Sequence, residues 1–541
     1  MKKGLLNPYV LSILLAGAGF AFFSSCTNDD DSTDQAISPE EAELNEYFKY
    51  DASQIEVVED TTFNILDEMR KRIQNKSNAN SETREDTAML EYYKAQYDRI
   101  QAFAERTADS IAAAEPGNSL EAITGQILEM GRAVISYNDV GADGKTKRLS
   151  MLVVYPTRFF VDIDAKNIIL GCHYTITDNN ERPTATGFQG LNDACFLGAE
   201  WATTENYLVV MPDYEGFGSS VDSKQPYLIR EVQARQCIKA LNVAINWFKN
   251  DHGEEFSDGR VVVEGFSQGG AVAAATYRYW LEHINDNWAR SFANPIVGAV
   301  CADGPYDPLA TLKYYCEKDW LSMPVAPALM LLGLCETDKD AIKAGLQPSD
   351  FFSESFCKSG IFERINEKTH PTTHCEYALG DMPGSMKVTE HTKVSASDAF
   401  KKEVFEYFRD GTEPTDNPEL LNKLNVLKNC LMKNSLFHNF ESLKSSYVLK
   451  AQIGSFTGTY HYAPQFTFFH GLYDTVVPYD NVVSVGKKWG FNRIKVVQFI
   501  NYFDHGDVGR SFFLEIHDDL VHEILDNKWT PGVSQYQSSL F

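Results

Sequence analysis

One serine of this sequence stands in a turn suited to a nucleophile. Residues Gly265 to Gly269 read G-F-S-Q-G, which matches the spacing G-x-S-x-G. The motif follows the valine-rich run 260–264 and precedes the alanine-rich run 271–277, so it falls where a strand turns sharply into a helix, as the motif requires. Glycines are expected at its two ends because a side chain there would collide with neighbouring backbone. The sequence therefore predicts Ser267 as a nucleophile on a strained elbow framed by Gly265 and Gly269.

A serine nucleophile needs a base, and the base needs a carboxylate that orients it. Asp474 lies in a turn just beyond the apolar run 466–470, and His505 lies just past the apolar run 494–500. Both residues therefore follow predicted strands, as Ser267 does. We predict a Ser267, His505 and Asp474 triad for acyl transfer.

The remaining histidines and nearby acids fit these roles less well. His470 lies within a strand end and is expected to shape the turn, while Asp504 and Asp507 adjoin the base in sequence, which makes the needed side-chain geometry awkward. Other histidines have no comparable acid partner or fall on the last helix as surface or packing residues: His173, His374, His438, His517 and His522.

The tetrahedral intermediate of acyl transfer carries an oxyanion that two backbone N–H groups must bind. The N–H of Gln268 is expected to be one donor because it follows the nucleophile directly. The second is expected from the loop after the third strand, where either Tyr174 or Thr175 is suitable. The sequence leaves these two alternatives open.

Strands alternate with helices over most of the chain after residue 117. Runs that are apolar throughout, separated by amphipathic segments, indicate a mainly parallel sheet covered on both faces. The expected strands are 133–137, 149–155, 168–174, 207–211, 261–263, 296–301, 466–470 and 494–500, and the expected helices include 228–248, 268–280 and about 508–525.

Helical patterns replace strands in two further segments. Residues 46–116 predict a helical N-terminal extension, a structural cover on the body, and residues 303–464 predict a helical cap inserted between two parts of the core, 117–302 and 465–541. Some apolar and aromatic cap residues are candidates for an acyl pocket, although their helical spacing is more typical of a core: Tyr314, Trp320, Leu329, Leu331 and Leu332.

From about residue 120 onward the chain resembles an α/β-hydrolase. Its order Ser, Asp, His is the order of that fold, and the segments 211–218 (M-P-D-Y-E-G-F-G) and 265–270 are similar to those of the secretory lipase family of fungi and bacteria. The resemblance implies esterase or lipase chemistry with no metal or organic cofactor, and a large helical cap before the acid. Asp213 is expected to hold a turn at the floor of the site. The acyl chain of the substrate stays open.

Composition excludes some other classes of function. The chain has 541 residues, 43% of them hydrophobic, which is typical of a globular protein, and its formal charge of −26 disfavours a nucleic-acid partner.

A peptidase like the prolyl-oligopeptidase relatives would need a large propeller that the helical extension cannot supply. A surface lipoprotein that only binds its ligand would have no reason to keep all three triad residues. A transferase with another acyl acceptor remains open.

The N-terminus predicts export and lipidation. Lys2 and Lys3 precede the apolar run 10–23, and Cys26 follows a short serine pair, which resembles a bacterial lipoprotein signal. We expect residues 1–26 to be the signal, Cys26 to carry lipid such as palmitate, and the acidic stretch 27–45 to be a flexible linker from an outer membrane or cell surface. The alternative is an ordinary signal peptide of a periplasmic or secreted protein. The other nine cysteines contain no C-x-x-C pair, and their pairing and the oligomeric state stay open.

Overall fold

The computed structural model describes residues 38–78, 84–114, 117, 119–158, 166–185, 193–253, 256, 258–382, 384–388, 391–439, 464–502 and 504–539. The chain divides into two units, Met1–Tyr47 and Phe48–Phe541. Helix α2 (Pro39–Phe48) begins inside the stretch 27–45 that was predicted to be a flexible linker, so that prediction is wrong from residue 39 on. The predicted signal and Cys26 lie outside the described residues.

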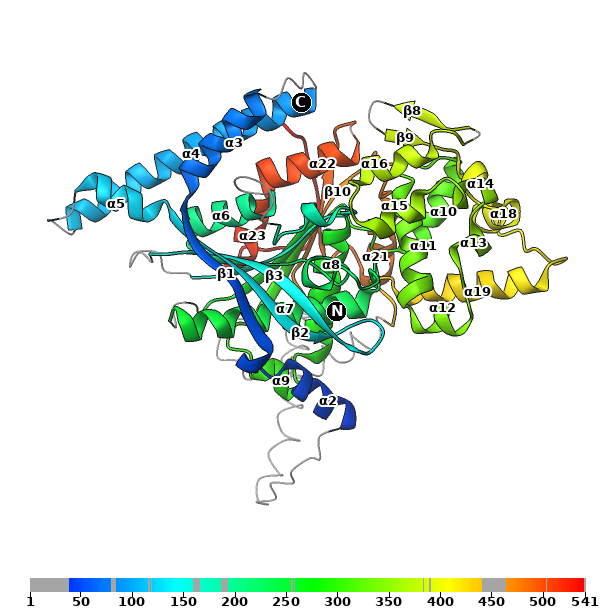
Figure 1. The fold of residues 1–541 in the computed structure, drawn as a ribbon, viewed down its shortest axis with the longest axis horizontal. Helices are drawn as coiled ribbons and strands as arrows, with labels where there is room; N and C mark the ends of the chain where they lie inside the picture. The colour runs from blue at the N-terminus through cyan, green and yellow to red at the C-terminus, as the bar shows by residue number, and fades with distance from the viewer. Residues whose placement is uncertain are drawn as a thin grey trace, which may run out of the picture. The chain divides into compact units, whose positions relative to one another are not determined.

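Ten strands of the described part form one sheet in the order β1-β2-β3-β5-β4-β6-β7-β10-β11-β12 (Figure 1). Neighbours from β5 to β12 are parallel, and β1, β2 and β3 join the sheet antiparallel. The strands are β1 (Ile55–Asn64), β2 (Glu129–Val140), β3 (Thr146–Pro156), β4 (Ile168–Cys172), β5 (Leu208–Pro212), β6 (Val261–Phe266), β7 (Ile296–Ala302), β10 (Phe466–Gly471), β11 (Lys495–Phe499) and β12 (Gly532–Tyr536).

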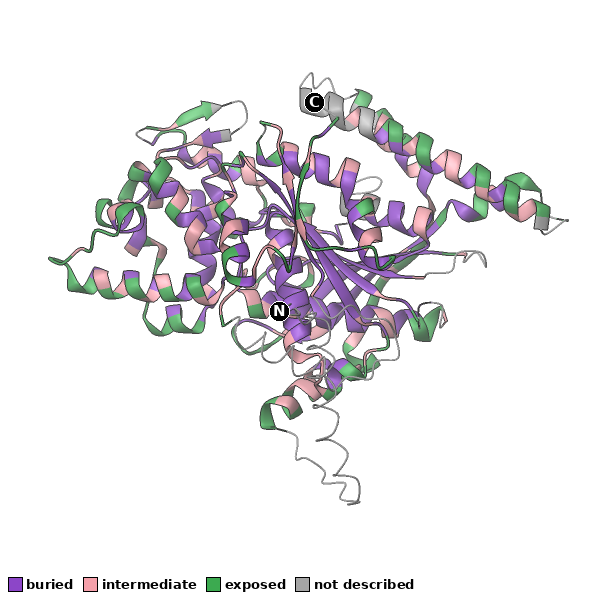
Figure 2. Cartoon of the chain, turned by 180° about the vertical axis from the view of Figure 1, so that it is seen from behind, coloured by how far each residue is buried: buried purple, intermediate pink, exposed green. Residues whose placement is uncertain are grey.

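Helices cover the sheet because its central strands have no face turned to solvent. Every residue of β4, β5, β6, β7 and β10 is buried, and Figure 2 shows this buried centre between helices whose outer faces are exposed. The main covering helices are α6 (Asp193–Glu205), α7 (Arg230–Asp251), α8 (Gln268–His283), α21 (Asp480–Trp489), α22 (His505–Ser511) and α23 (His517–Leu525). The mainly parallel sheet flanked by helices is therefore confirmed.

The N-terminal extension differs from the prediction of a helical segment over 46–116. Residues 55–64 form the edge strand β1, which pairs antiparallel with β2, and only then do α3 (Ile65–Asn78) and α4 (Arg84–Ala114) follow. Most of β1 is exposed, so its valines and threonines give no alternating buried pattern. The strand β12, with the polar sequence GVSQY, was missed for the same reason. Edge strands carry a weaker pattern than central ones because one of their sides lacks a partner.

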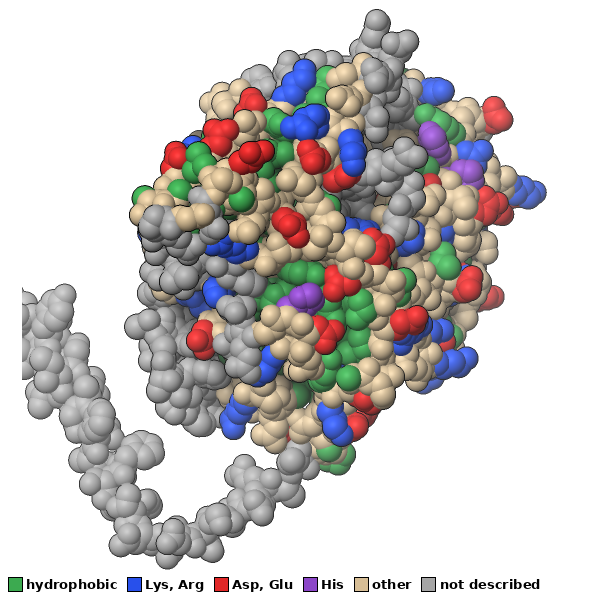
Figure 3. Space-filling model, turned by 60° about the vertical axis from the view of Figure 1, so that its left-hand side comes forward, with side chains coloured by type: hydrophobic (Ala, Val, Ile, Leu, Met, Phe, Trp, Pro, Cys, Tyr) green, Lys and Arg blue, Asp and Glu red, His purple; other side chains and the backbone are tan. Residues whose placement is uncertain are grey.

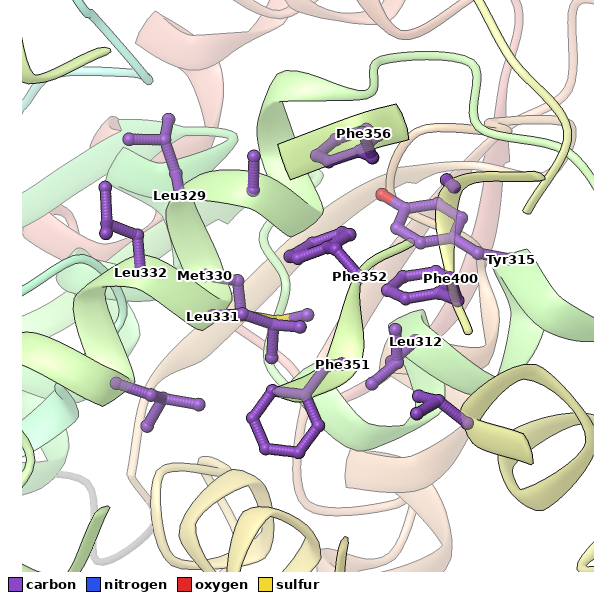
Figure 4. Close-up of a cluster of buried hydrophobic side chains, with 14 of the residues drawn as sticks. Leu312, Tyr315, Leu329, Met330, Leu331, Leu332, Phe351, Phe352, Phe356 and Phe400 are labelled. Atoms are coloured by element: carbon purple, nitrogen blue, oxygen red, sulfur yellow. The ribbon is translucent and has the colours of Figure 1, made fainter. Parts of the chain in front are cut away.

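The described part of the predicted cap, residues 303–439 with two short gaps, is mainly helical and contains a small hairpin formed by β8 (Met386–Val388) and β9 (His391–Lys393). It has a core of its own, which includes Leu329, Leu331 and Leu332 together with the aromatic residues Phe351 and Phe352 (Figure 4). Tyr314 packs against that core, and Trp320 is half-buried. The three leucines are therefore residues of the cap core, as their helical spacing indicated. The cap helices include α10 (Pro308–Lys318), α11 (Val325–Thr337), α12 (Lys339–Lys343), α15 (Ile361–Glu367), α18 (Lys402–Asp410) and α19 (Pro418–Lys433).

Two surface features bear on the predicted partners. On the face shown in Figure 3, lysine and arginine side chains lie scattered among acidic ones. Among the described residues, no helix combines the length and the apolar character that crossing a bilayer requires. Neither feature tests the predicted lipid anchor, because Cys26 lies outside the described part.

Candidate active site

Ser267 lies on a strained turn between β6 and α8. Its backbone has φ 57° and ψ −123°, a region that costs a non-glycine residue energy, and its N–H donates to the carbonyl oxygen of Ala302 at 2.8 Å. A Cβ on Gly269 would lie 2.0 Å from the carbonyl oxygen of Cys172, and one on Gly265 would lie 2.5 Å from the Gly269 carbonyl. Both positions therefore require glycine, for the steric reason expected from the sequence.

The structure brings the three predicted triad residues together. His505 Nε2 lies 2.8 Å from Ser267 Oγ, and His505 Nδ1 lies 2.5 Å from Asp474 Oδ2. All three residues are buried, with exposed fractions of 8% for Ser267 and His505 and 2% for Asp474. With Nδ1–H donated to Asp474, Nε2 is left free to accept the serine proton. The arrangement meets the geometric requirement for an activated serine.

Backbone donors hold the Asp474 carboxylate in place. Its Oδ1 accepts the N–H groups of Val476 at 2.8 Å and Val477 at 3.0 Å, within the same turn. Burial alone would raise the pKa of Asp474, but the charge of the His505 ring and its hydrogen bond outweigh that effect and hold the pKa below its usual range. Asp474 is therefore suited to stabilise a positive charge on His505.

Packing and a helix start fix the imidazole of His505. The ring stacks on Phe266 with centroids 4.7 Å apart, and Phe513 meets Phe266 edge-on. His505 is the first residue of α22, and Asp504 caps that helix by accepting the N–H of Asp507 at 3.1 Å. Asp504 and Asp507 thus serve the helix and do not orient the base.

The predicted oxyanion donors come from the start of α8 and from the loop after β4, which passes Gly269 at Cys172 and His173. Gln268 is fully buried at the start of α8, and its N–H has no acceptor among the described residues. In the loop after β4, the carbonyl of Tyr174 lies 2.6 Å from His173 Nδ1, and the Thr175 hydroxyl lies 2.8 Å from the Tyr227 hydroxyl. Because a trans peptide points its C=O and N–H in opposite directions, the N–H of Thr175 faces away from the His173 ring.

A second carboxyl group lies beside the triad and was missed by the sequence reasoning. Asp303 follows β7 directly, is fully buried and has a positive φ of 42°. Its Oδ1 accepts the N–H of Gly471 at 2.8 Å, and its Oδ2 lies 3.8 Å from His505 Nδ1. The available signal was an acid directly after an apolar strand, at the sheet edge that carries Ser267 and Asp474. In the sequence, Asp303 marks the boundary of the predicted cap, and it was assigned no catalytic role.

By distance alone, the side chains of Asp303, Asp474 and His505 could hold a metal ion, since their ligand atoms lie within 4.8 Å of one another. Both ring nitrogens of His505 are already engaged, by Ser267 and by Asp474. A metal bound here would have to break one of these contacts, so the group fits a proton relay better than a metal site.

Asp213 holds a turn, as expected. Its carboxylate accepts the Ser150 hydroxyl at 2.6 Å and the Thr184 N–H at 2.9 Å, and it is fully buried. The carbonyl of Asp213 also lies 3.2 Å from His173 Nε2. Asp213 thus supports the loop that carries Tyr174 and Thr175 and makes no contact with the triad side chains among the described residues.

A cavity of about 240 Å³ is lined by Gly265 of the elbow and by none of the three triad residues. Most of its walls are apolar, with a few polar groups, which is typical of small-molecule sites. Its lining residues are Arg72, Gly171, Cys172, His173, Tyr174, Ile176, Asn180, Glu181, Leu197, Met211, Glu264, Gly265 and Phe513. Arg72 comes from α3, so the N-terminal extension contributes a wall of this cavity.

Solved structures with a similar fold include the rice cell wall degrading esterase LipA from Xanthomonas oryzae. A mutant of it matches with a TM-score of 0.51 and 18% identity over 74% of this chain and 91% of that chain, and its ligand-bound form with 0.51 and 17% over 78% and 95%. Candida antarctica lipase A matches with 0.46 and 15% over 76% and 81%. No protein-family model and no curated protein matches the sequence. The likeness to LipA confirms the predicted α/β-hydrolase fold.

Proposed function

Because the chain has the α/β-hydrolase fold, we propose that it is a serine hydrolase that cleaves carboxylic esters. The observation that carries this proposal is the continuous hydrogen-bond chain from Ser267 Oγ through both ring nitrogens of His505 to Asp474 Oδ2. A chain of this kind activates a serine for acyl transfer. The esterase named among the similar structures supports the choice of esters over peptides.

In the acylation step, Ser267 Oγ attacks the ester carbonyl while His505 Nε2 takes the hydroxyl proton. Asp474 stabilises the imidazolium that forms. The N–H groups of Gln268 and Thr175 bind the oxyanion. We choose Thr175 over Tyr174 because the Tyr174 carbonyl points at the His173 ring, so the N–H of Thr175 in the same peptide group points away from that ring. His505 then gives its proton to the leaving alcohol.

Water completes the cycle. His505 removes a proton from a water molecule, the hydroxide attacks the acyl-serine, and the proton returns to Ser267 as the acid leaves. This sequence uses side chains and backbone alone and needs no metal or organic cofactor. Our candidate for the place that receives part of the substrate is the cavity beside the elbow, because its lining includes Gly265 of the elbow and Tyr174 of the loop after β4.

The first test is hydrolysis of p-nitrophenyl esters from acetate to palmitate by the chain without residues 1–26. We expect turnover that Ser267→Ala abolishes and that Ser291→Ala, a matched serine variant on a distant helix end, retains. A preference for short acyl chains would fit a cavity of about 240 Å³. If the wild type cleaves no ester, the proposal fails, and proline-containing peptides become the next substrates to assay.

We also propose that Cys26 is the lipidated first residue of the mature chain and that the enzyme works while anchored to a membrane. The support is the signal-like sequence of residues 1–26. Metabolic labelling with palmitate should mark the wild type and should not mark Cys26→Ser, whereas Cys357→Ser should stay labelled. Labelling of Cys26→Ser, or release of the wild type into the medium, would contradict the anchor.

A further inference from the structure

The triad acid has a carboxyl neighbour. Asp303 reaches the site from the end of β7, and its ligand atoms lie within 4.8 Å of those of Asp474 and His505. The exposed fractions of Asp303 and Asp474 are 0% and 2%. Two adjacent buried carboxyl groups cannot both be ionised at low cost, so a proton should be shared within this group.

If Asp303 and Asp474 were both ionised, no hydrogen would be available for the contacts between Asp303 and its neighbours. Asp303 Oδ2 and His470 Nδ1 are buried and accept no hydrogen bond from the described residues, although His470 Nδ1 lies 3.3 Å from Asp303 Oδ1 and Asp303 Oδ2 lies 3.8 Å from His505 Nδ1. His470 Nε2 lies 3.0 Å from the carbonyl oxygen of Val477, which can only accept, so Nε2 carries the hydrogen. Burial lowers the pKa of His470 to about 4, so its Nδ1 carries a lone pair.

The two carboxyl groups differ in the number of donors they receive. Asp474 accepts the N–H groups of Val476 and Val477 and the Nδ1–H of His505. Asp303 accepts one N–H, from Gly471. The anion is therefore better stabilised on Asp474, and the proton belongs on Asp303. Burial and the neighbouring Asp474 carboxylate raise the pKa of Asp303 well above its usual range, in agreement.

We propose that Asp303 is a neutral carboxylic acid that donates its O–H to the Asp474 carboxylate and so acts as a positioning residue for the triad acid. The positioning role of Asp303 rests on the proposed ester hydrolysis, whereas the protonation state of Asp303 does not. The titratable groups that face Asp303 are Asp474 and His470 from β10 and the turn after it, and His505 from α22. Tyr306, next to the turn after β7, donates its hydroxyl to the Cys301 carbonyl at 2.9 Å.

The backbone at Asp303 fits such a role. A positive φ of 42° is unfavourable for an aspartate and persists where the surroundings impose it. The N–H of Asp303 donates to the Phe469 carbonyl at 2.9 Å, and its side chain accepts the Gly471 N–H, so both ends of the residue are tied to β10. The donated O–H would restrict rotation of the Asp474 carboxylate and keep Oδ2 directed at His505.

The protonation state can be measured without any substrate. We expect an infrared carbonyl band of a buried carboxylic acid in the wild type at neutral pH that is absent from Asp303→Asn. Asp338→Asn is the matched control, because Asp338 is buried in the cap and accepts two backbone N–H groups beside Lys433. The control should retain the band. A wild-type spectrum that Asp303→Asn leaves unchanged would overturn the proposal.

Kinetics test the positioning role. The amide of Asp303→Asn can accept from Gly471 and donate to Asp474, so kcat/KM should stay within about threefold and the acid limb of its pH profile should not move. Asp303→Ala removes the donor, and kcat should fall about ten- to a hundredfold with a smaller change in KM. If Asp303 were ionised instead, Asp303→Asn would remove a negative charge 3.8 Å from His505 Nδ1 and shift the acid limb by about one unit or more.

The two measurements separate two kinds of failure. If the wild type cleaves no ester, the proposed function fails, and the infrared result still decides the protonation of Asp303. If the wild type is active and Asp303→Ala keeps full kcat, the positioning role is wrong although the hydrolase is right. Thermal unfolding of each variant shows whether a lost activity reflects a lost fold.

Discussion

In the described part of the chain, two clusters of histidine and carboxylate lie close to the nucleophile, and they differ in whether the histidine can act as a base. The triad cluster consists of Ser267, Asp474, His505, Asp303 and His470. The second, which we call the anchor cluster, consists of Glu264, His517, Asp518, Glu200 and Arg99. Glu264 lies on β6, three residues before Ser267, which stands on the turn that follows this strand.

The two clusters differ in how firmly their histidines hold a proton. In the anchor cluster His517 Nδ1 lies 3.4 Å from Glu264 and Nε2 lies 3.1 Å from Asp518, which is also bound by Arg99 at 2.8 Å. Burial lowers the pKa of His517, but the carboxylates of Asp518 and Glu264 outweigh it and raise the pKa to about 9. His517 is thus a fixed cation at neutral pH.

His505 has one close carboxylate and one nitrogen on a serine, so it can gain and lose a proton. His517 has a carboxylate on each nitrogen, and its proton is held. Burial beside an acid therefore does not make a histidine a base. A histidine acts as a base when one of its ring nitrogens carries no proton and is directed at a reactive oxygen, as in His505.

The largest expected effect comes from removing the base. His505→Ala should lower kcat for ester hydrolysis by about 10⁴-fold or more, because Ser267 then lacks a proton acceptor. His517→Ala, measured at a temperature where both variants are folded, should keep kcat within about tenfold. Steady-state rates on a p-nitrophenyl ester check both. Equal losses in the two variants would break the distinction between the clusters.

The anchor cluster should instead govern stability. His517→Leu leaves the buried Glu264 carboxylate without its cation and should lower the free energy of unfolding by about 3–5 kcal/mol. His522→Leu is the control, because His522 makes a partly exposed ion pair with Glu205 at 3.3 Å and should cost less than about 1 kcal/mol. Chemical denaturation measures both. A cost for His517→Leu no larger than that of the control would argue against the anchor cluster.

Stability should also depend on pH through His517. Its folded pKa of about 9 lies above the ordinary value of 6.5, so the folded state holds the proton more tightly. The stabilisation is complete below about pH 6.5 and is lost as the pH rises through about 9, by about 3 kcal/mol at most. Unfolding at several pH values should show this fall in the wild type and a smaller one in His517→Leu. Parallel curves would mean that His517 is not the responsible group.

The smallest expected effect concerns the helix that carries the base. Asp504→Ala removes the cap of α22 and should lower the free energy of unfolding by about 1 kcal/mol, with a modest loss of kcat because His505 is the first residue of that helix. Asp504→Asn retains a capping oxygen and should be nearly neutral. The two variants together show how strongly the cap positions His505. Equal behaviour would mean that packing on Phe266 is sufficient.

The triad could be predicted because each of its members follows a strand whose apolar run is plain in the sequence. Parallel strands end at one edge of a sheet, so Ser267, Asp474 and His505 had to lie near one another. Asp303 offered the same signal, an acid directly after the run 296–302, and was overlooked because one acid already satisfied the base. The buried pair of carboxyl groups depends on side-chain distances that a strand pattern does not contain.

The anchor cluster could not be predicted from the sequence. Arg99, Glu264 and His517 come from three distant segments, and their contact depends on how α4 and α23 pack beside β6. The edge strand β1 was equally hidden, since its outer side is exposed and its residues do not alternate in burial. Patterns of burial identify central strands well, whereas edges and inter-helix contacts are fixed by tertiary packing.

The most direct test of the central claim is reaction of the chain with an alkyl fluorophosphonate, followed by intact mass spectrometry and peptide mapping. We predict one adduct per molecule, located on Ser267, formed slowly or not at all in His505→Ala and formed normally in His522→Leu. Absence of an adduct on the wild type, or an adduct on a different serine that does not depend on His505, would contradict the proposed serine hydrolase.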